Sequence, residues 1–217
     1  MIQGCLFDMD GVLLDTERLG MTLLPQIAKQ YGYDFSSDLY LRILGMHRAL
    51  SRGITQKELG KDYPHDAVLT DTFSAMVARA EEGTLPLKAG VADCFARLKA
   101  RGIRLALATS TGRDTVDRYF RSIPEIGTAF DAVVCGSEVA NSKPAPDIYL
   151  KAAEKLDLPP SACIGVEDSL SGLKSLTAAG IRSVMIPDIL PYGETFAPFV
   201  TWTADSLSAL CDLVESL

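Results

Sequence analysis

The sequence predicts an α/β fold, a doubly wound parallel sheet with helices on both faces, and three observations lead to this prediction. Short apolar runs alternate with longer segments in which apolar residues recur every three to four positions. The runs are apolar throughout, as expected for strands that are buried on both faces. One gap between two runs is much longer than the others and indicates an inserted domain.

Six apolar runs are the predicted strands, and the predicted helices lie between them. The strands are expected at 3–7, 103–108, 131–135, 162–166 and 182–186, with a weaker one at 199–203. Apolar residues at i, i+3, i+4 and i+7 predict helices over 91–98, 116–123, 148–156 and 207–214. Gly102 follows the first of these helices as a C-cap, and Pro144 and Pro146 precede the third.

The long gap lies between the first two predicted strands, from Asp8 to Ile103. A single crossover between parallel strands takes roughly 30 residues, so this segment must contain an insertion. Its patterns are helical, at 23–31 with a kink expected at Pro25, at 39–50 and at 66–82. We therefore predict two domains, an α/β core at 1–16 and 85–217 and a helical domain at 17–84.

The composition excludes several classes of partner. The 217 residues include 21 Lys and Arg against 28 Asp and Glu, which gives a formal net charge of −7. With no run of Lys or Arg, the chain has no basic surface for a nucleic acid polymer or an anionic membrane. It has two histidines, His47 and His65, so we expect its polar chemistry to rest mainly on carboxylates and lysine.

The cysteines and the N-terminal residues indicate where in the cell the protein is expected. The five cysteines form no C-x-x-C pair and lie mostly in apolar runs, so we expect buried thiols in a reducing environment. Asp8 and Asp10 come too early for the apolar core of a secretory signal, and no apolar stretch approaches the roughly 18 residues of a membrane span. A cytoplasmic protein is expected.

Polar side chains follow four of the predicted strands, at the point where each strand ends. They are Asp8 and Asp10, Thr109 with Ser110 and Thr111, Ser142 with Lys143, and Glu167 with Asp168. The carboxyl ends of parallel strands meet at one edge of the sheet, where ligands bind. Four carboxylates gathered there would repel one another without a cation. Because hard oxygen ligands favour Mg²⁺, a magnesium and phosphate site is predicted.

Each of these signals also has a purely structural interpretation. An isolated D-x-D sequence is common in turns and at helix caps, and Glu167 with Asp168 could cap the helix that follows them. Thr109 and Ser110 could cap their own following helix, and Lys143 could be a solvated loop charge. The functional interpretation is favoured because independent signals meet at one place.

Four segments resemble the four motifs of the haloacid dehalogenase-like (HAD) hydrolases, namely DMDGVLLDTE, LATS, SKPAPD and GVEDS. The likeness covers the whole chain. It is strongest to the branch of beta-phosphoglucomutase-like and pseudouridine-phosphatase-like enzymes. The resemblance implies that the α/β core is the catalytic domain and that the helical domain is the family's cap.

The resemblance also implies a role for each motif residue. Asp8 would be the nucleophile that forms an aspartyl-phosphate, and Asp10 would protonate the leaving oxygen and then activate water. Thr109 and Lys143 would hold the transferred phosphoryl group, and Ser110 would bind the substrate beside them. The implied ligands of Mg²⁺ are Asp8, the carbonyl of Asp10, Glu167 and Asp168.

Two arginines are further candidates for binding the substrate. The segment Leu44-Gly45-Met46-His47-Arg48 resembles the specificity loop of the relatives, where an arginine after such a glycine meets the phosphate or sugar end of the ligand. This resemblance assigns Arg48 to the substrate, although a solvated helix arginine is an equally good interpretation. Arg113, one turn after Thr109, is a weaker candidate of the same kind.

The predicted function is a phosphatase that acts on a small phosphorylated metabolite, a sugar phosphate or a nucleoside monophosphate, because every position needed for hydrolysis is present. A hexose-phosphate mutase is the alternative, but the mutases that the chain resembles carry a histidine at the position of Gly20. A non-catalytic binding protein on the same fold is disfavoured by the intact acids, lysine and hydroxyls. We expect a monomer.

Overall fold

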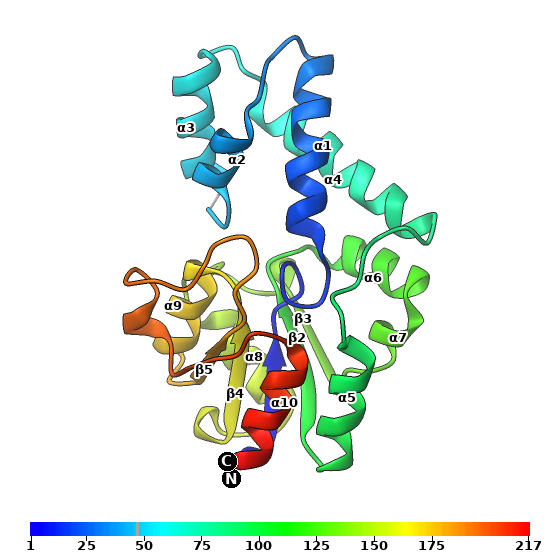
Figure 1. Cartoon of the computed structure of the whole chain (residues 1–217), viewed down its shortest axis with the longest axis vertical. Helices are drawn as coiled ribbons and strands as arrows, with labels where there is room; N and C mark the ends of the chain where they lie inside the picture. Colours follow the sequence, from blue (N-terminus) through cyan, green and yellow to red (C-terminus); the bar gives the residue numbers. More distant parts are fainter. Residues whose placement is uncertain (47) are drawn as a thin grey trace. The chain divides into compact units, whose positions relative to one another are not determined.

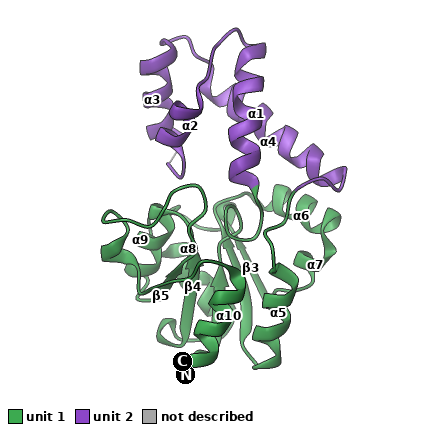
Figure 2. Cartoon of the chain, viewed as in Figure 1, with its two compact units in different colours: residues 1–15, 86–217 green, residues 16–85 purple. Residues whose placement is uncertain are grey.

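The structure is a computed structural model that describes residues 1–46 and 48–217 (Figure 1). The chain divides into two compact units (Figure 2). The core unit comprises Met1–Asp15 and Pro86–Leu217, and the helical unit is Thr16–Leu85. Along the chain, the helical unit is therefore an insertion that follows the first strand of the core unit.

The core unit is built on a six-stranded parallel sheet with the strand order β3-β2-β1-β4-β5-β6 (Figure 1). The strands are β1 (Gly4–Phe7), β2 (Arg104–Thr109), β3 (Ala132–Cys135), β4 (Cys163–Glu167), β5 (Arg182–Met185) and β6 (Trp202–Thr203). Each lies at one of the predicted apolar runs, although the weak run at 199–203 yields just the short β6. The predicted parallel α/β sheet is confirmed.

Helices cover both faces of this sheet, because alternate residues of a strand point to opposite sides. The helices of the core unit are α5 (Val91–Ala100), α6 (Arg113–Ser122), α7 (Pro124–Gly127), α8 (Asp147–Lys155), α9 (Leu170–Ala178) and α10 (Leu207–Ser216). In β1, Leu6 packs in an apolar cluster with Ala152 of α8. The ring of the next residue, Phe7, lies 5.5 Å from that of Phe95 of α5. Burial on both sides explains why the strands are apolar throughout.

The register of the sheet brings the ends of the central strands together. Phe7 of β1 pairs with Leu107 of β2 on one side and with Val166 of β4 on the other. The backbone N–H of Asp8 then donates to the carbonyl oxygen of Val166 at 3.0 Å. Asp8 and Glu167 are therefore neighbours at the carboxyl edge of the sheet.

The helical unit folds around its own apolar cluster. Its helices are α1 (Thr16–Gln30), α2 (Ser37–Ile43), α3 (Arg48–Leu59) and α4 (His65–Glu81). Leu24 and Ile27 of α1, Leu39 of α2 and Val68 of α4 are buried together in this cluster. α1 continues past Pro25 as a single helix.

The predicted helix over 39–50 is wrong, because the structure has two helices in this region. α2 ends at Ile43, and α3 begins at Arg48 and continues beyond the predicted end. Gly45 lies between them with φ at +67°, a left-handed conformation that suits glycine and interrupts a helix. His47 lies outside the described residues, so the expected specificity loop is described on either side of it.

The core unit contains both ends of the insertion, and the chain before it is hydrogen-bonded to the chain after it. The backbone N–H of Asp15 donates to the carbonyl oxygen of Pro86 at 2.9 Å, and that of Lys88 donates to Leu13 at 2.9 Å. The Lys88 ammonium also lies 2.8 Å from Oδ1 of Asp15. The start and the end of the insertion are thus fixed beside each other within the core unit.

The cysteines are buried and free of disulfides, as the sequence predicts. They are Cys5, Cys94, Cys135, Cys163 and Cys211. Cys94 of α5 and Cys211 of α10 lie with their sulfur atoms 3.2 Å apart. This contact is part of the packing between these two helices on one face of the sheet.

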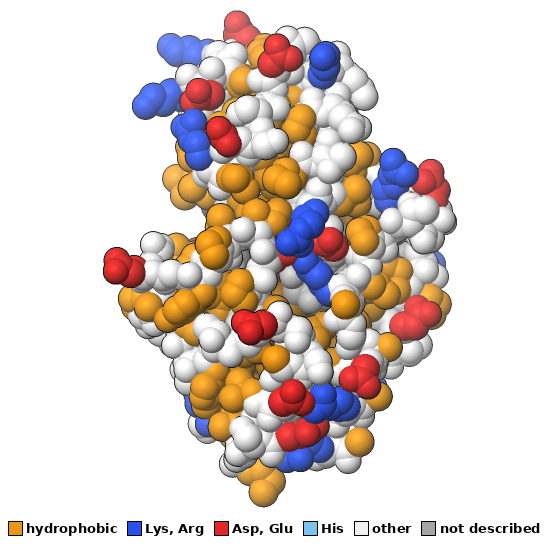
Figure 3. Space-filling view, viewed as in Figure 1, with side chains coloured by type: hydrophobic (Ala, Val, Ile, Leu, Met, Phe, Trp, Pro, Cys, Tyr) orange, Lys and Arg blue, Asp and Glu red, His pale blue; other side chains and the backbone are white. Residues whose placement is uncertain are grey.

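The surface carries charges of both signs. On the face drawn in Figure 3, Lys and Arg side chains lie scattered among Asp, Glu and uncharged side chains. Among the described residues, none of the helices combines the length and the apolar character that crossing a membrane requires.

Close packing in the sheet gives a testable prediction about stability. A Cβ at Gly165 of β4 would overlap the side chain of Leu176, which is fully buried. We expect Gly165→Ala to lower the free energy of unfolding by about 1–3 kcal/mol, because added volume in a packed core strains its neighbours. Gly193→Ala is the control, since a Cβ there meets open space. Urea unfolding of both variants checks this, and equal stabilities would contradict it.

Candidate functional site

Asp8 and Asp10 follow β1 directly and form the first part of the site. Asp8 is 8% exposed. Gly11 has φ at +82°, which lets the chain turn sharply behind the two acids. A Cβ at Gly11 would overlap the carboxylate of Asp168. Glycine therefore also makes the room in which Asp168 approaches this loop.

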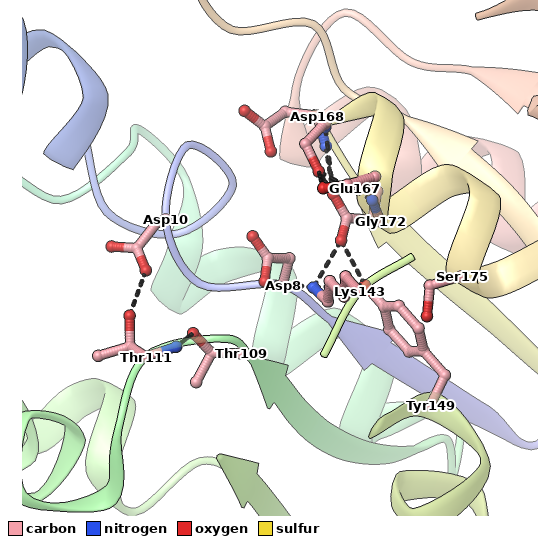
Figure 4. A network of polar contacts seen from close by, with 12 residues as sticks. Asp8, Asp10, Thr109, Thr111, Lys143, Tyr149, Glu167, Asp168, Gly172 and Ser175 are labelled. Carbon is pink, nitrogen blue, oxygen red and sulfur yellow. Dashed lines mark hydrogen bonds and ion pairs between the residues drawn. The ribbon is translucent and has the colours of Figure 1, made fainter. Parts of the chain in front are cut away.

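Lys143 connects acids from two neighbouring strands. It lies in the loop before α8, and its side chain is buried. The ammonium donates to Oδ1 of Asp8 at 2.7 Å and to Oε1 of Glu167 at 2.6 Å (Figure 4). Ser175 of α9 donates to the carbonyl oxygen of Ala145 at 2.6 Å and so anchors the loop that carries Lys143. The interpretation of Lys143 as a solvated loop charge is therefore wrong.

Glu167 is the last residue of β4 and has no exposed surface. Its Oε2 accepts from the backbone N–H groups of Asp168 at 3.2 Å and Ser169 at 3.1 Å, and from the Ser169 hydroxyl at 2.9 Å. The N-cap of α9 is Ser169, whose Oγ accepts from the backbone N–H of Gly172 at 3.1 Å. A Cβ at Gly172 would overlap the Glu167 carboxylate, so glycine is required at this turn of α9.

Three carboxylates converge at this edge of the sheet in a way that suits a divalent cation. Asp8, Glu167 and Asp168 each offer one oxygen, and these oxygens lie within 4.8 Å of one another. Three carboxylates against the one ammonium of Lys143 leave an excess of negative charge. Hard oxygen donors with this charge suit Mg²⁺.

The buried charges shift one another's pKa values. Burial raises the pKa of Asp8 to about 8, against the opposing effect of the Lys143 ammonium. Burial also disfavours the charged forms of Lys143 and Glu167, but the charges of Asp8 and Glu167 outweigh it for Lys143, and the charge of Lys143 outweighs it for Glu167. The pKa of Lys143 is therefore raised and that of Glu167 is lowered. A cation bound beside Asp8 would favour its charged form.

The hydroxyls after β2 lie beside Asp10. Thr109 is fully buried, and its Oγ1 accepts from the backbone N–H of Thr111 at 3.1 Å. The Thr111 hydroxyl donates to Oδ2 of Asp10 at 2.8 Å, which holds this carboxylate apart from the three converging acids (Figure 4). Ser110 is exposed. The N-cap of α6 is Gly112, so Thr109 and Ser110 do not cap that helix.

The two arginines that the sequence assigns to the substrate are held by acids of their own unit. Arg48 begins α3, and its Nε donates to Oδ1 of Asp66 of α4 at 2.8 Å. Arg113 begins α6, and it donates from Nε to Glu138 at 3.0 Å and from Nη2 to the carbonyl oxygen of Val133 at 3.1 Å. Each arginine thus has a structural partner, and its role toward a substrate stays a prediction.

Two side chains at the site are given no role of their own by the sequence analysis. Tyr149 of α8 lies between Lys143 and Glu167, and its hydroxyl bonds to both (Figure 4). Its position on the apolar face of a helix predicts burial, and the further signal is that a buried tyrosine hydroxyl needs a partner. Thr111 bonds to Asp10, but nothing in its spacing distinguishes it from the neighbouring hydroxyls.

Comparison with known proteins gives consistent matches. The sequence model of the haloacid dehalogenase-like hydrolases matches residues 2–180. Protein CbbY of Rhodobacter capsulatus is 36% identical over 216 residues, which cover 96% of this chain and 95% of the relative. The probable pseudouridine-5'-phosphatase of Drosophila melanogaster is 35% identical over 194 residues, which cover 86% of this chain and 82% of the relative.

A solved structure agrees with these matches. It is a mutant of CbbY from Rhodobacter sphaeroides in complex with xylulose-(1,5)-bisphosphate, and it has a TM-score of 0.77 and 30% identity to this chain. The match covers 96% of both chains. The chain is therefore an enzyme of the haloacid dehalogenase-like hydrolase family, as its four motifs predict.

Proposed function

We propose that the protein is a Mg²⁺-dependent phosphatase that hydrolyses a small phosphomonoester through an aspartyl-phosphate on Asp8. The observation that carries this proposal is the buried group of Asp8, Lys143 and Glu167, with Asp168 beside it, at the carboxyl edge of the sheet. A carboxylate can attack an anionic phosphate when cations screen both charges. The relative named as a pseudouridine-5'-phosphatase supports the same chemistry.

The first step is the transfer of the phosphoryl group to Asp8. A carboxylate oxygen of Asp8 attacks phosphorus, and the bond between phosphorus and the leaving oxygen breaks. Lys143 holds Oδ1 of Asp8, which fixes the direction of the carboxylate and adds positive charge where negative charge gathers. Asp10 in its protonated form gives its proton to the leaving oxygen, so that the product leaves as an alcohol.

The second step is the hydrolysis of the aspartyl-phosphate. The Asp10 carboxylate takes a proton from water, and the water oxygen attacks phosphorus. The bond to Asp8 breaks, phosphate leaves, and Asp8 regains its carboxylate. Thr111 holds the Asp10 carboxylate for both proton transfers. We assign Thr109, with Ser110 and Lys143, to hydrogen bonds with the phosphoryl group.

Four groups of this chain would hold Mg²⁺. They are the carboxylates of Asp8, Glu167 and Asp168 and the carbonyl oxygen of Asp10. When bound there, Mg²⁺ would screen the charge of Asp8 from that of the phosphate. Lys143 supplies the second positive charge from the protein itself.

We propose a sugar phosphate or a nucleoside monophosphate as the substrate. One relative is named for the phosphate of a nucleoside, pseudouridine, and a related structure contains a sugar bisphosphate. The helical unit would act as the cap that excludes water during the transfer, with Arg48 as its contact to the substrate. The buried thiols fit a cytoplasmic location, and we propose that the enzyme is a monomer.

Hexose-phosphate mutase activity is the second candidate, and the packing at Gly20 argues against it. A Cβ at Gly20 would overlap the hydroxyl of Tyr40 and lie 2.9 Å from Cε of Met76. The Tyr40 hydroxyl is itself held by Glu17, whose Oε2 accepts from it at 2.9 Å. The room that a histidine would need at position 20 is therefore already filled.

Removing the nucleophile or the metal tests the mechanism. We expect Asp8→Asn to lower kcat for p-nitrophenyl phosphate by roughly 10⁴-fold or more, because the amide cannot form the aspartyl-phosphate. Chelation with EDTA should abolish turnover, and added Mg²⁺ should restore it. Asp93→Asn, at an exposed acid of α5, is the control and should keep full activity. Substantial turnover by Asp8→Asn, or in EDTA, would contradict the mechanism.

The choice between phosphatase and mutase can be tested with one substrate. We expect β-glucose 1-phosphate to yield inorganic phosphate and no glucose 6-phosphate, because Gly20 has no side chain where the mutases that the chain resembles carry a histidine. Phosphorus NMR of the reaction mixture distinguishes the two products. Accumulation of glucose 6-phosphate would establish the mutase instead.

The role of Arg48 can be separated from its structural partner. We expect Arg48→Ala to raise KM about tenfold for the best substrate of a panel of sugar phosphates and nucleoside monophosphates, with kcat little changed, because a contact to the bound phosphate is lost. Arg42→Ala is the matched control, since Arg42 is also a half-exposed arginine paired with an acid of the helical unit. Equal KM values for the two variants would assign Arg48 a structural role.

A further inference from the structure

We infer that Tyr149 is a positioning residue whose hydroxyl sets the orientation of Lys143 and Glu167 at the same time. The inference rests on the proposed function, because it concerns how these two groups are aimed at Asp8 and at the cation. Tyr149 does not need to contact the substrate to act in this way.

Tyr149 is placed to act on both charged groups. It is fully buried on α8, and its hydroxyl lies 2.6 Å from Oε1 of Glu167 and 3.1 Å from Nζ of Lys143 (Figure 4). The Lys143 ammonium also lies 4.8 Å from the centre of the Tyr149 ring. A cation over an aromatic face is stabilised further where water is excluded.

The donors and acceptors of this group fix the direction of each hydrogen bond. An ammonium has three N–H donors and no acceptor, and Lys143 has three acceptors, which are Asp8, Glu167 and the Tyr149 hydroxyl. Since the phenol oxygen accepts from Lys143, its own proton goes to Oε1 of Glu167. Each proton therefore has one acceptor, and Lys143 is held at three points.

Loss of the hydroxyl would disturb both ends of this arrangement. One N–H of Lys143 would be buried without an acceptor, which is costly away from water. The ammonium would then be held by Asp8 and Glu167 alone, so its direction toward Asp8 would be fixed less firmly. Oε1 of Glu167 would lose one of its two donors, so the carboxylate would be held less firmly toward a cation. Partners that orient metal ligands typically change metal affinity about 10- to 100-fold.

The test measures metal binding and turnover separately. Binding of Mn²⁺ to the full chain without substrate is followed by electron paramagnetic resonance, and kcat and KM are measured with p-nitrophenyl phosphate. We expect Tyr149→Phe to weaken Mn²⁺ binding about 10- to 100-fold and to lower kcat by a similar factor, with KM little changed. Tyr63→Phe, at a buried tyrosine of the helical unit, is the matched control and should change neither quantity.

Further replacements at position 149 separate hydrogen bonding from packing. 4-Fluorophenylalanine fills the space of the hydroxyl but cannot donate a proton. It should weaken Mn²⁺ binding and lower kcat as we expect for Tyr149→Phe, and it provides the test if Tyr149→Phe folds poorly. 4-Aminophenylalanine keeps a donor for Glu167 but is a poor acceptor for Lys143, so it should restore Mn²⁺ affinity to within about threefold of the original protein and restore kcat in part. Thermal unfolding of each variant shows whether it is folded.

The outcomes distinguish this inference from the proposed function. Weaker Mn²⁺ binding by the variants that lack a donor at position 149 supports the inference, whether or not a phosphate ester is hydrolysed. If no phosphate ester is hydrolysed, the proposed function is wrong, but the inference about metal binding stands. Equal Mn²⁺ affinity for the original protein and Tyr149→Phe, or no binding by either, overturns the inference. A lower melting temperature with unchanged affinity and kcat would also overturn it, since Tyr149 would then serve packing alone.

Discussion

The buried ammonium of Lys143 is the interaction on which the site depends. Asp8 and Glu167 end adjacent strands, and taking two carboxylates out of water side by side is unfavourable unless a cation lies between them. That cation comes from the loop before α8, which Ser175 ties to α9. The burial of the two acids therefore depends on the sheet, on this loop and on the helices α8 and α9 together.

The sheet and the meeting of these charges are predictable from the sequence for a clear physical reason. A strand that is buried on both faces has no polar residue to interrupt it, so its end is marked by the first charge that follows. Asp8 and Glu167 can be predicted as site residues because each is the first charged residue after a predicted apolar strand. Since the ends of parallel strands share one edge, their neighbourhood follows from the fold class, and a lysine after a third strand is expected to join them.

Other features depend on geometry that a linear pattern does not contain. Apolar spacing continues through Gly45, and the left-handed backbone there is what separates α2 from α3. The partner of Arg48 lies on another helix, at Asp66, and is selected by how α3 packs against α4. Tyr149 satisfies a burial pattern just as leucine would, because periodicity records which side chains are covered and says nothing about where a hydroxyl points.

The hydrogen bond that joins Asp15 to Pro86 has a consequence for the chain as a polymer. Because Asp15 and Pro86 are hydrogen-bonded to each other, residues 16–85 are a loop that is closed at its two ends. The entropy cost of closing a flexible loop grows only slowly with the length of the loop. Closing the chain at Asp15 and Pro86 therefore costs little more conformational entropy for this long insertion than it would for a short loop. The length of residues 16–85 is thus compatible with a fixed end of β1, because the two ends of the insertion are hydrogen-bonded to each other within the core unit.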